Sequence, residues 1–141
     1  MAAVLATYSI ALIVAGHGVA PMPVILYFGL GAMFGKGDAD KVFIVSSVVG
    51  LASLVLLVLA PVVSRVWGRN SAAIRVLVVI GLYGSWAIPA GVAAYEESGG
   101  DVHKILPNFS AELMVSAPFQ ITVAVVLYFA WRRLRAGVIR P

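Results

Sequence analysis

Residues 42–64, VFIVSSVVGLASLVLLVLAPVVS, run for 23 positions without an Asp, Glu, Lys or Arg. About 20 apolar residues in a helix are enough to cross the hydrocarbon core of a bilayer, which is roughly 30 Å thick. Three further runs without these charged residues, 35, 20 and 19 residues long, occupy positions 1–35, 76–95 and 113–131. The four runs hold 97 of the 141 residues. The sequence therefore predicts an integral membrane protein.

The composition excludes several other classes of protein. Hydrophobic residues make up 62% of the chain and charged residues only 11%, whereas charged residues are about a quarter of an average soluble domain. A soluble enzyme, a nucleic-acid-binding module and a disulfide-stapled secreted domain are all excluded. The chain has no cysteine, so thiolate catalysis and Cys-ligated metals are excluded as well. We expect membrane lipid as a partner and no nucleic acid.

The expected fold is a single all-α transmembrane domain over residues 1–141, a bundle of four helices. The spans are predicted at about 5–34, 42–64, 74–95 and 112–131. The first run is unusual because 35 helical residues would reach about 52 Å, more than one span needs. We expect one long helix, tilted and kinked near Pro21 and Pro23. The alternative is a span over about residues 2–20, followed by a short apolar helix from Pro23 to Phe34 on the outer surface.

The charges separate into two groups when four spans are assigned. One side of the membrane receives seven basic residues and no acid, and the other receives three basic and six acidic residues. Because basic residues in short loops mark the cytoplasmic side, both termini are predicted to be cytoplasmic. The richness in Ala, Val and Gly, with Arg over Lys, suggests a prokaryote. The bacterial inner membrane is therefore the expected location. The seven basic residues are Arg65, Arg69, Arg75, Arg132, Arg133, Arg135 and Arg140.

His17 is the one ionisable side chain within the uncharged runs. A polar residue at membrane depth raises a functional hypothesis by default, and an imidazole can ligate haem iron or hydrogen-bond a quinone. A haem held by two histidines would need a second buried histidine, and His103 falls in the predicted outer loop. The alternative interpretation is a structural histidine bonded to a neighbouring helix. The cofactor stays unknown, and the sequence offers no catalytic or metal-ligating motif.

Small residues recur at four-residue spacing in the third predicted span, which allows helices to pack backbone to backbone in lipid. We expect Gly81, Ser85, Ala87 and Gly91 to form a helix-packing face. After the fourth span, Arg132, Arg133 and Arg135 form a basic cluster. Such a cluster is suited to anionic lipid headgroups.

Three functions follow from these features. The first is a non-catalytic, four-span subunit of a larger respiratory, photosynthetic or transport complex, with other membrane subunits or further copies of itself as partners. The second is a homo-oligomeric pore with a mildly polar lining. The third is a haem- or quinone-binding redox component that uses His17. The candidate pore-lining residues are Ser46, Ser53, Gln120 and Thr122.

Overall fold

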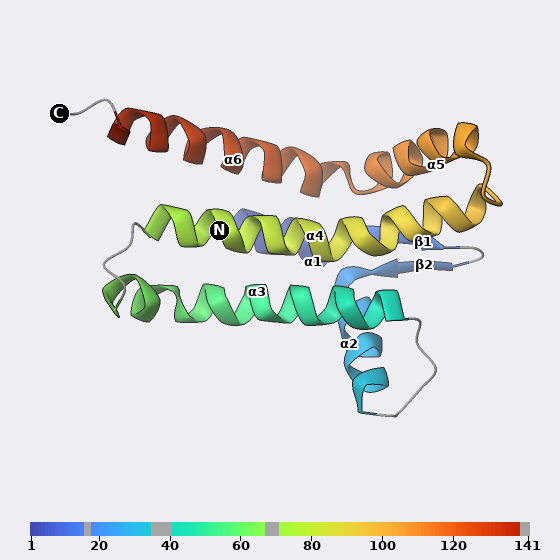
Figure 1. The fold of residues 1–141 in the computed structure, drawn as a ribbon, viewed down its shortest axis with the longest axis horizontal. Coiled ribbons are helices and arrows are strands. Elements are labelled where there is room, and N and C mark those ends of the chain that lie inside the picture. Colours follow the sequence, from blue (N-terminus) through green and yellow to red (C-terminus); the bar gives the residue numbers. More distant parts are fainter. Residues whose placement is uncertain (16–17, 35–40, 67–70, 139–141) are drawn as a thin grey trace.

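The computed structural model describes residues 1–15, 18–34, 41–66 and 71–138. These residues form six helices and one two-stranded hairpin (Figure 1). The mainly helical structure agrees with the all-α class, and the hairpin is an addition to it. In chain order the elements are α1 (Ala2–Ser9), β1 (Leu12–Ala15), β2 (Gly18–Pro21), α2 (Met22–Met33), α3 (Lys41–Val66), α4 (Ser71–Glu97), α5 (Val102–Val115) and α6 (Ala117–Val138).

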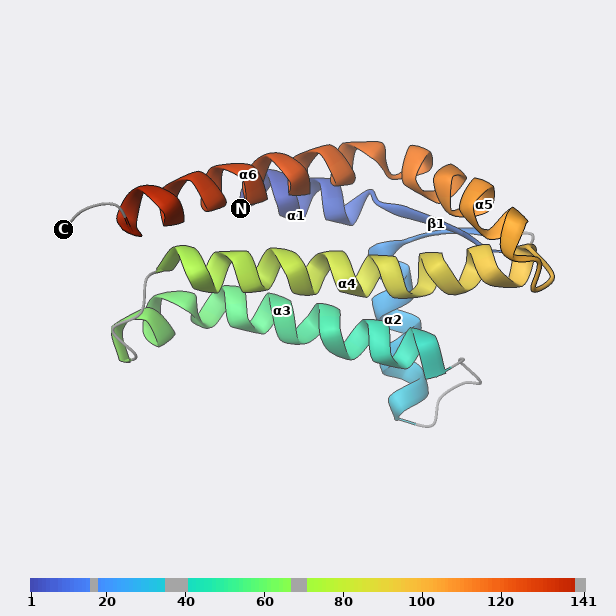
Figure 2. The ribbon, with the colours of Figure 1, turned by 45° about the horizontal axis from the view of Figure 1, so that its top comes forward.

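Two described helices are long and apolar enough to cross a membrane by themselves, namely α3 and α4. A third span is formed if α5 and α6, which meet at an angle of 84° at Ser116, count as one bent pair. In Figures 1 and 2, α4 lies between α3 and α6, and α1 lies beside α4 and α6. The structure therefore gives two or three candidate spans where the sequence predicts four.

One difference is the bend at Ser116 within the predicted span 112–131, and the other lies in the first predicted span, 5–34. Instead of one long helix with a kink, α1 ends at Ser9, and the chain turns into the antiparallel strands β1 and β2 before α2 begins. Pro21 is extended (ψ 151°) and precedes α2, and Pro23 lies in the first turn, where a missing backbone N–H costs nothing. These prolines therefore start a helix and do not kink one. The short helix of the alternative prediction, Pro23 to Phe34, corresponds closely to α2.

Helix α2 leaves the bundle sideways, across α3 (Figures 1 and 2). The crossing is close because Gly29 lies against Phe43 and Ser47 of α3, where a Cβ would overlap the Phe43 carbonyl oxygen and the Ser47 side chain. The Ser47 hydroxyl donates to the carbonyl oxygen of Ile25 at 3.1 Å. One glycine and one serine thus fix the point at which α2 crosses α3.

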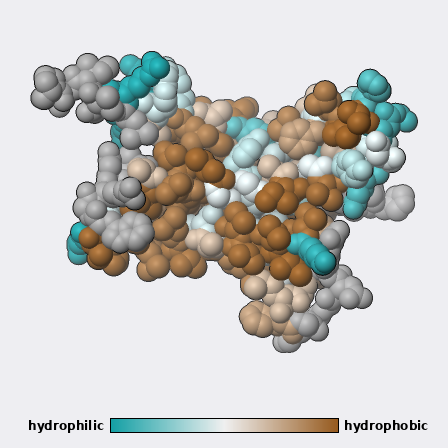
Figure 3. Space-filling model, viewed as in Figure 1, coloured by the Kyte–Doolittle hydropathy of each residue, from teal (hydrophilic) through white to brown (hydrophobic). Residues whose placement is uncertain are grey.

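Aromatic rings fill the centre of the bundle. Trp86 and Phe119 are fully buried, and their ring centroids lie 6.3 Å apart. Tyr8 packs against Phe119 with a centroid separation of 5.5 Å. The outer surface is also largely apolar, and hydrophobic residues cover most of α3 in Figure 3. An apolar exterior over an apolar core is typical of a protein surrounded by lipid.

The charged residues lie at opposite ends of the bundle. The end of α3, the beginning of α4 and the end of α6 lie together at one end (Figure 1). That end carries Arg65, Arg75, Arg132, Arg133 and Arg135. The opposite end carries Lys41, Glu96, Glu97, Asp101 and Lys104.

Candidate functional site: a polar cluster at the helix breaks

Three interruptions of regular backbone meet near the middle of α4. They are the end of α1, the step from β2 into α2, and the bend between α5 and α6 at Ser116. The backbone N–H of Met22 donates to the carbonyl of Ala11 at 3.0 Å, which ties the first two together. Trp86 is the sixteenth of the 27 residues of α4, and it contacts the bend between α5 and α6 through Ser116. We name the side chains gathered there the central polar cluster: Tyr8, Ser46, Ser85, Trp86 and Ser116.

Ser116 satisfies the free edge of β1. Its hydroxyl donates to the Leu12 carbonyl oxygen at 2.7 Å and accepts from the Leu12 N–H at 3.1 Å. The indole N–H of Trp86 lies 3.1 Å from both the Leu12 carbonyl oxygen and the Ser116 hydroxyl. An unpaired backbone group away from water costs free energy comparable to a lost hydrogen bond, so irregular backbone at membrane depth needs such partners. Ser116 and Trp86 therefore satisfy the backbone groups of Leu12, at the beginning of the hairpin, in an apolar surrounding.

A second set of bonds joins α1, α3 and α4. The hydroxyls of Tyr8 and Ser85 are 2.7 Å apart, and Ser85 donates to the Leu82 carbonyl at 2.8 Å, so Tyr8 acts as the donor to Ser85. Ser46 of α3 donates to the carbonyl oxygen of Ser85. Gly50 leaves room for this arrangement, because a Cβ there would lie within 3.0 Å of the Tyr8 hydroxyl and of Leu26.

The side chains of the central polar cluster are hydrogen-bonded to one another and to backbone groups, so the cluster holds neighbouring helices and the hairpin together. Its hydroxyl and indole protons are already donated to protein acceptors. Within the four described ranges, no three His, Asp or Glu side chains lie together so as to hold a metal ion.

Glu112 is buried, and sequence reasoning misses this. Its side chain is only 3% exposed, in the last turn of α5, four residues before the bend. The charge pattern places Glu112 among the six acidic residues of the outer side. A helical periodicity could have found it, because Phe109, Glu112, Leu113 and Ser116 follow the i, i+3, i+4, i+7 pattern of one helix face.

Gln120 in α6 carries the one unsatisfied buried polar atom in the described part of the chain. Its side-chain nitrogen Nε2 is buried and has no hydrogen-bond partner there. A buried amide nitrogen without an acceptor costs about 1–3 kcal/mol. Gln120 is thus a position where the sequence is not optimised for the stability of this fold.

The predicted packing residues are spread along α4. Gly81 lies against Ser53 of α3, and Ser85 belongs to the central polar cluster. Ala87 is partly buried beside the hydrophobic core. A Cβ at Gly91 would meet no described atom within 4 Å. His17 lies outside the described residues.

The other predicted residues are placed as follows. Arg132, Arg133 and Arg135 are exposed on α6, and the Arg135 guanidinium lies 4.2 Å from the ring centre of Trp131. Of the candidate pore-lining residues, Ser46 and Ser53 are buried where α3 meets α4. The Thr122 hydroxyl donates to the Pro118 carbonyl in its own helix.

Comparison of the chain with protein-family models, with curated proteins and with solved structures gave no match.

Proposed function

We propose that this protein is a non-catalytic subunit of a larger membrane assembly, of the respiratory, photosynthetic or transport kind, and that it docks to a neighbouring integral membrane subunit through α2. The observation that carries the proposal is the unpartnered aromatic face of α2. Tyr27 and Phe28 are 74% and 63% exposed, and Phe34 at the end of the helix is 75% exposed.

The length and direction of α2 favour a protein partner for this face. A helix of 12 residues is about 18 Å long, too short to cross the bilayer. It projects sideways from the bundle (Figure 2), so its axis runs across the direction of the lipid chains. Aromatic residues and Met are enriched at the cores of protein interfaces, and Met33 is also exposed. The sequence of α2 contains no charged residue, so an apolar helix of another subunit is the partner it fits.

The state of the polar residues also supports a non-catalytic role. Tyr8, Ser46, Ser85 and Ser116 use their hydroxyl groups to join elements of the same chain. Ser46 and Ser53 pack between α3 and α4, an arrangement better suited to helix locking than to lining a pore.

For the topology, we propose four passes in the bacterial inner membrane with both termini cytoplasmic. Met1 lies beside Ser64 and Arg75 at the basic end, whereas α3 begins with Lys41 at the other end. The first segment begins in the basic half of the bundle and connects to α3 at the other end (Figure 1), so we propose that α1 and the hairpin together take the place of a fourth spanning helix. The basic end is then the cytoplasmic end.

Native mass spectrometry of the protein, extracted gently from its own membranes, tests the docking role. The wild-type chain should migrate with larger subunits, and the double variant Tyr27→Ala/Phe28→Ala should lose at least nine-tenths of that complex, since buried aromatic anchors contribute about 2 kcal/mol or more each. The matched control is Tyr128→Ala/Phe129→Ala on α6. This pair has the same edge-to-face geometry, with centroids 5.6 Å apart against 5.8 Å in α2.

The outcomes separate the candidate functions. Equal loss in both double variants would show that α2 has no special role in docking. A chain that migrates alone as a monomer would contradict the subunit proposal, and a homo-oligomer without other subunits would favour the pore.

Cysteine labelling tests the orientation, because the chain has no cysteine of its own. A membrane-impermeant maleimide added to intact cells permeable only at the outer membrane should label Glu97→Cys and leave Arg133→Cys unlabelled. Both positions are exposed. The reverse pattern would invert the proposed topology.

A further inference from the structure

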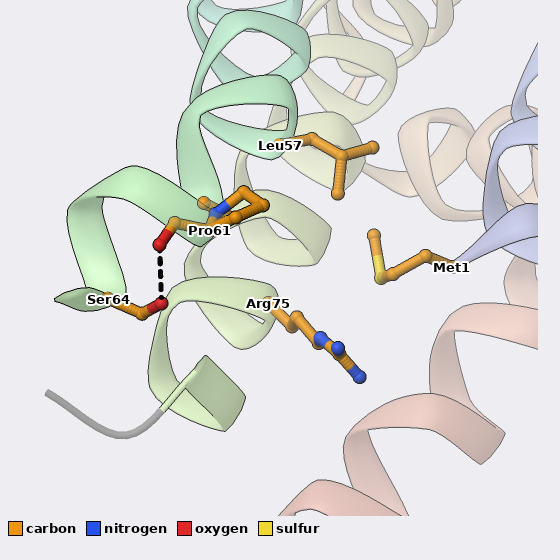
Figure 4. A pocket seen from close by; sticks show the side chains of 6 residues that line it. Met1, Leu57, Pro61, Ser64 and Arg75 are labelled. Atoms are coloured by element: carbon orange, nitrogen blue, oxygen red, sulfur yellow. Dashed lines mark hydrogen bonds between the residues drawn. The ribbon is translucent and has the colours of Figure 1, made fainter.

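A cavity of about 420 Å³ lies at the basic end of the bundle, where α3 ends and α4 begins. Figure 4 shows its lining, with Met1 and Leu57 on one side and Pro61, Ser64 and Arg75 around the rest. Ala60 completes the set. Its volume lies within the range of about 300–1,000 Å³ that is usual for small-molecule sites.

The walls of the cavity are of two kinds. The side chains of Leu57, Ala60 and Pro61 are apolar and lie within the predicted span 42–64, and the side chain of Met1 is apolar as well. Ser64 and Arg75 are polar and lie near the ends of their helices, so they are at headgroup level if α3 spans the bilayer. The cavity is therefore amphipathic along the membrane normal.

No described acid neutralises Arg75. In the described ranges, the one ion pair within 4.0 Å joins Lys104 to Asp101 at the opposite end of the molecule. The Arg75 side chain is exposed, and in Figure 4 its guanidinium extends into the open space between α4 and its neighbours. Arg65, in the last turn of α3, adds a second positive charge at the same end of the bundle. This end of the protein therefore presents cations beside an apolar recess.

Ser64 is already used as a donor but retains acceptor capacity. Its hydroxyl donates to the Pro61 carbonyl at 3.0 Å, drawn as the dashed line in Figure 4. A serine oxygen in that state can still accept a hydrogen bond. It can therefore receive a hydroxyl of a bound headgroup, while Arg75 supplies the charge that an anion requires.

We propose that this cavity binds one anionic glycerophospholipid, with its phosphate at Arg75, a headgroup hydroxyl at Ser64, and the upper part of an acyl chain against Leu57, Ala60 and Pro61. The occupant is a lipid and not a soluble anion because the larger part of the lining is apolar. Basic pockets between membrane helices are suited to anionic headgroups. The inference is independent of the docking role of α2, which lies at a different part of the fold.

The test counts lipids retained by the purified protein in native mass spectrometry, after reconstitution with phosphatidylglycerol or with phosphatidylcholine. The wild-type protein should retain one phosphatidylglycerol at least fivefold more strongly than phosphatidylcholine. Arg75→Gln should abolish that preference, because one cation at the membrane surface contributes about fivefold in affinity. The control Lys104→Gln removes an exposed cation of α5 at the opposite end of the molecule and should leave the preference unchanged.

A second variant tests the apolar part of the site. Ala60→Phe fills the recess and should reduce retention of both lipids, while Arg75 stays in place. Since Arg75 is exposed, Arg75→Gln should fold like the wild type, and it decides the question even if Ala60→Phe does not fold.

Three results would overturn the proposal: equal retention of the two lipids by the wild type, an unchanged preference in Arg75→Gln, or displacement of the bound lipid by millimolar inorganic phosphate. The last would assign the site to a soluble anion.

Discussion

Replacing Ser116 with alanine removes the hydroxyl that joins the bend between α5 and α6 to strand β1. In the wild-type protein this hydroxyl donates to the Leu12 carbonyl oxygen and accepts from the Leu12 N–H. After the change, the Leu12 carbonyl oxygen keeps the indole N–H of Trp86 at 3.1 Å. The Leu12 N–H loses its acceptor. The variant therefore leaves one backbone donor unsatisfied in a half-buried, apolar environment.

The expected loss of stability follows from the one backbone donor, the Leu12 N–H, that is left without an acceptor. An unsatisfied buried donor costs about 1–3 kcal/mol. Interhelical hydrogen bonds of polar side chains in lipid are worth about 0.6 kcal/mol on average and up to about 1.7. All three hydrogen bonds of the Ser116 hydroxyl are lost, but only the Leu12 N–H is left without a partner, because the Leu12 carbonyl and the Trp86 indole stay bonded to each other. We therefore expect Ser116→Ala to lower the free energy of unfolding by about 2 kcal/mol.

Equilibrium unfolding in mixed micelles, followed by circular dichroism during a titration with sodium dodecyl sulfate, measures this change. Ser110→Ala is the matched control, since Ser110 is an exposed serine of α5 whose hydroxyl donates only to the Leu106 carbonyl of its own helix. It should change the free energy by less than about 0.5 kcal/mol. Ser116→Thr keeps the hydroxyl and should recover part of the loss. The reasoning is refuted if Ser116→Ala and Ser110→Ala have the same small effect.

Three further predictions use the same titration. Gly29→Ala should lower the free energy of unfolding by about 1–3 kcal/mol, because the added Cβ would overlap backbone and side-chain atoms of α3. The control Gly31→Ala, whose Cβ would meet no described atom within 4 Å, should leave this free energy unchanged or raise it by up to about 1 kcal/mol. Similar values for the two variants would contradict the close crossing of α2 and α3. Gln120→Met should be neutral or stabilising by about 1–2 kcal/mol, since it removes a buried nitrogen without a partner, and a loss above about 1 kcal/mol would show that the amide is engaged. A double-mutant cycle of Tyr8→Phe and Ser85→Ala should give a coupling of about 0.6–1.5 kcal/mol, and additivity of the two changes would argue against their hydrogen bond.

The runs without charged residues predict correctly where α3 and α4 lie, but they do not predict where a helix ends inside such a run. Helices α3 and α4 contain the predicted spans 42–64 and 74–95, and each extends by a few residues into the charged segments beside them. The predicted span 112–131 instead crosses the bend at Ser116, so its first residues belong to α5. No charge marks that bend. Pro118, two residues after the bend, has no backbone N–H to continue the hydrogen bonds of α5, and the Ser116 hydroxyl bonds to Leu12 of β1 instead of to its own helix.

The hairpin was hidden from the sequence for a related reason. Leu12–Ala15 is a run of four apolar residues, and such a run is compatible with a buried strand as well as with a helix. Pro21 and Pro23 predict a kink in a long helix, whereas in the structure Pro21 ends β2 and Pro23 lies in the first turn of α2. Of the central polar cluster, the sequence patterns indicate Ser85 as a packing residue and Ser46 as a pore-lining residue, but they do not indicate Tyr8 or Ser116. Their role depends on partners 30 to 104 positions away, which no local pattern reveals.

The central polar cluster and the docking face of α2 are linked through the hairpin. Because Met22 is held to Ala11 by a backbone hydrogen bond, the beginning of α2 is fixed relative to the end of α1 and to Leu12, which Ser116 and Trp86 hold in turn. Ser47 and Gly29 then set where α2 crosses α3. A polar cluster deep in the bundle can therefore determine the position of a helix that projects from it. If α2 is the docking element, Ser116→Ala should weaken the complex as well as the fold, whereas Tyr27→Ala/Phe28→Ala should weaken the complex alone. A Ser116→Ala protein that is destabilised in micelles yet still fully assembled would separate the two roles.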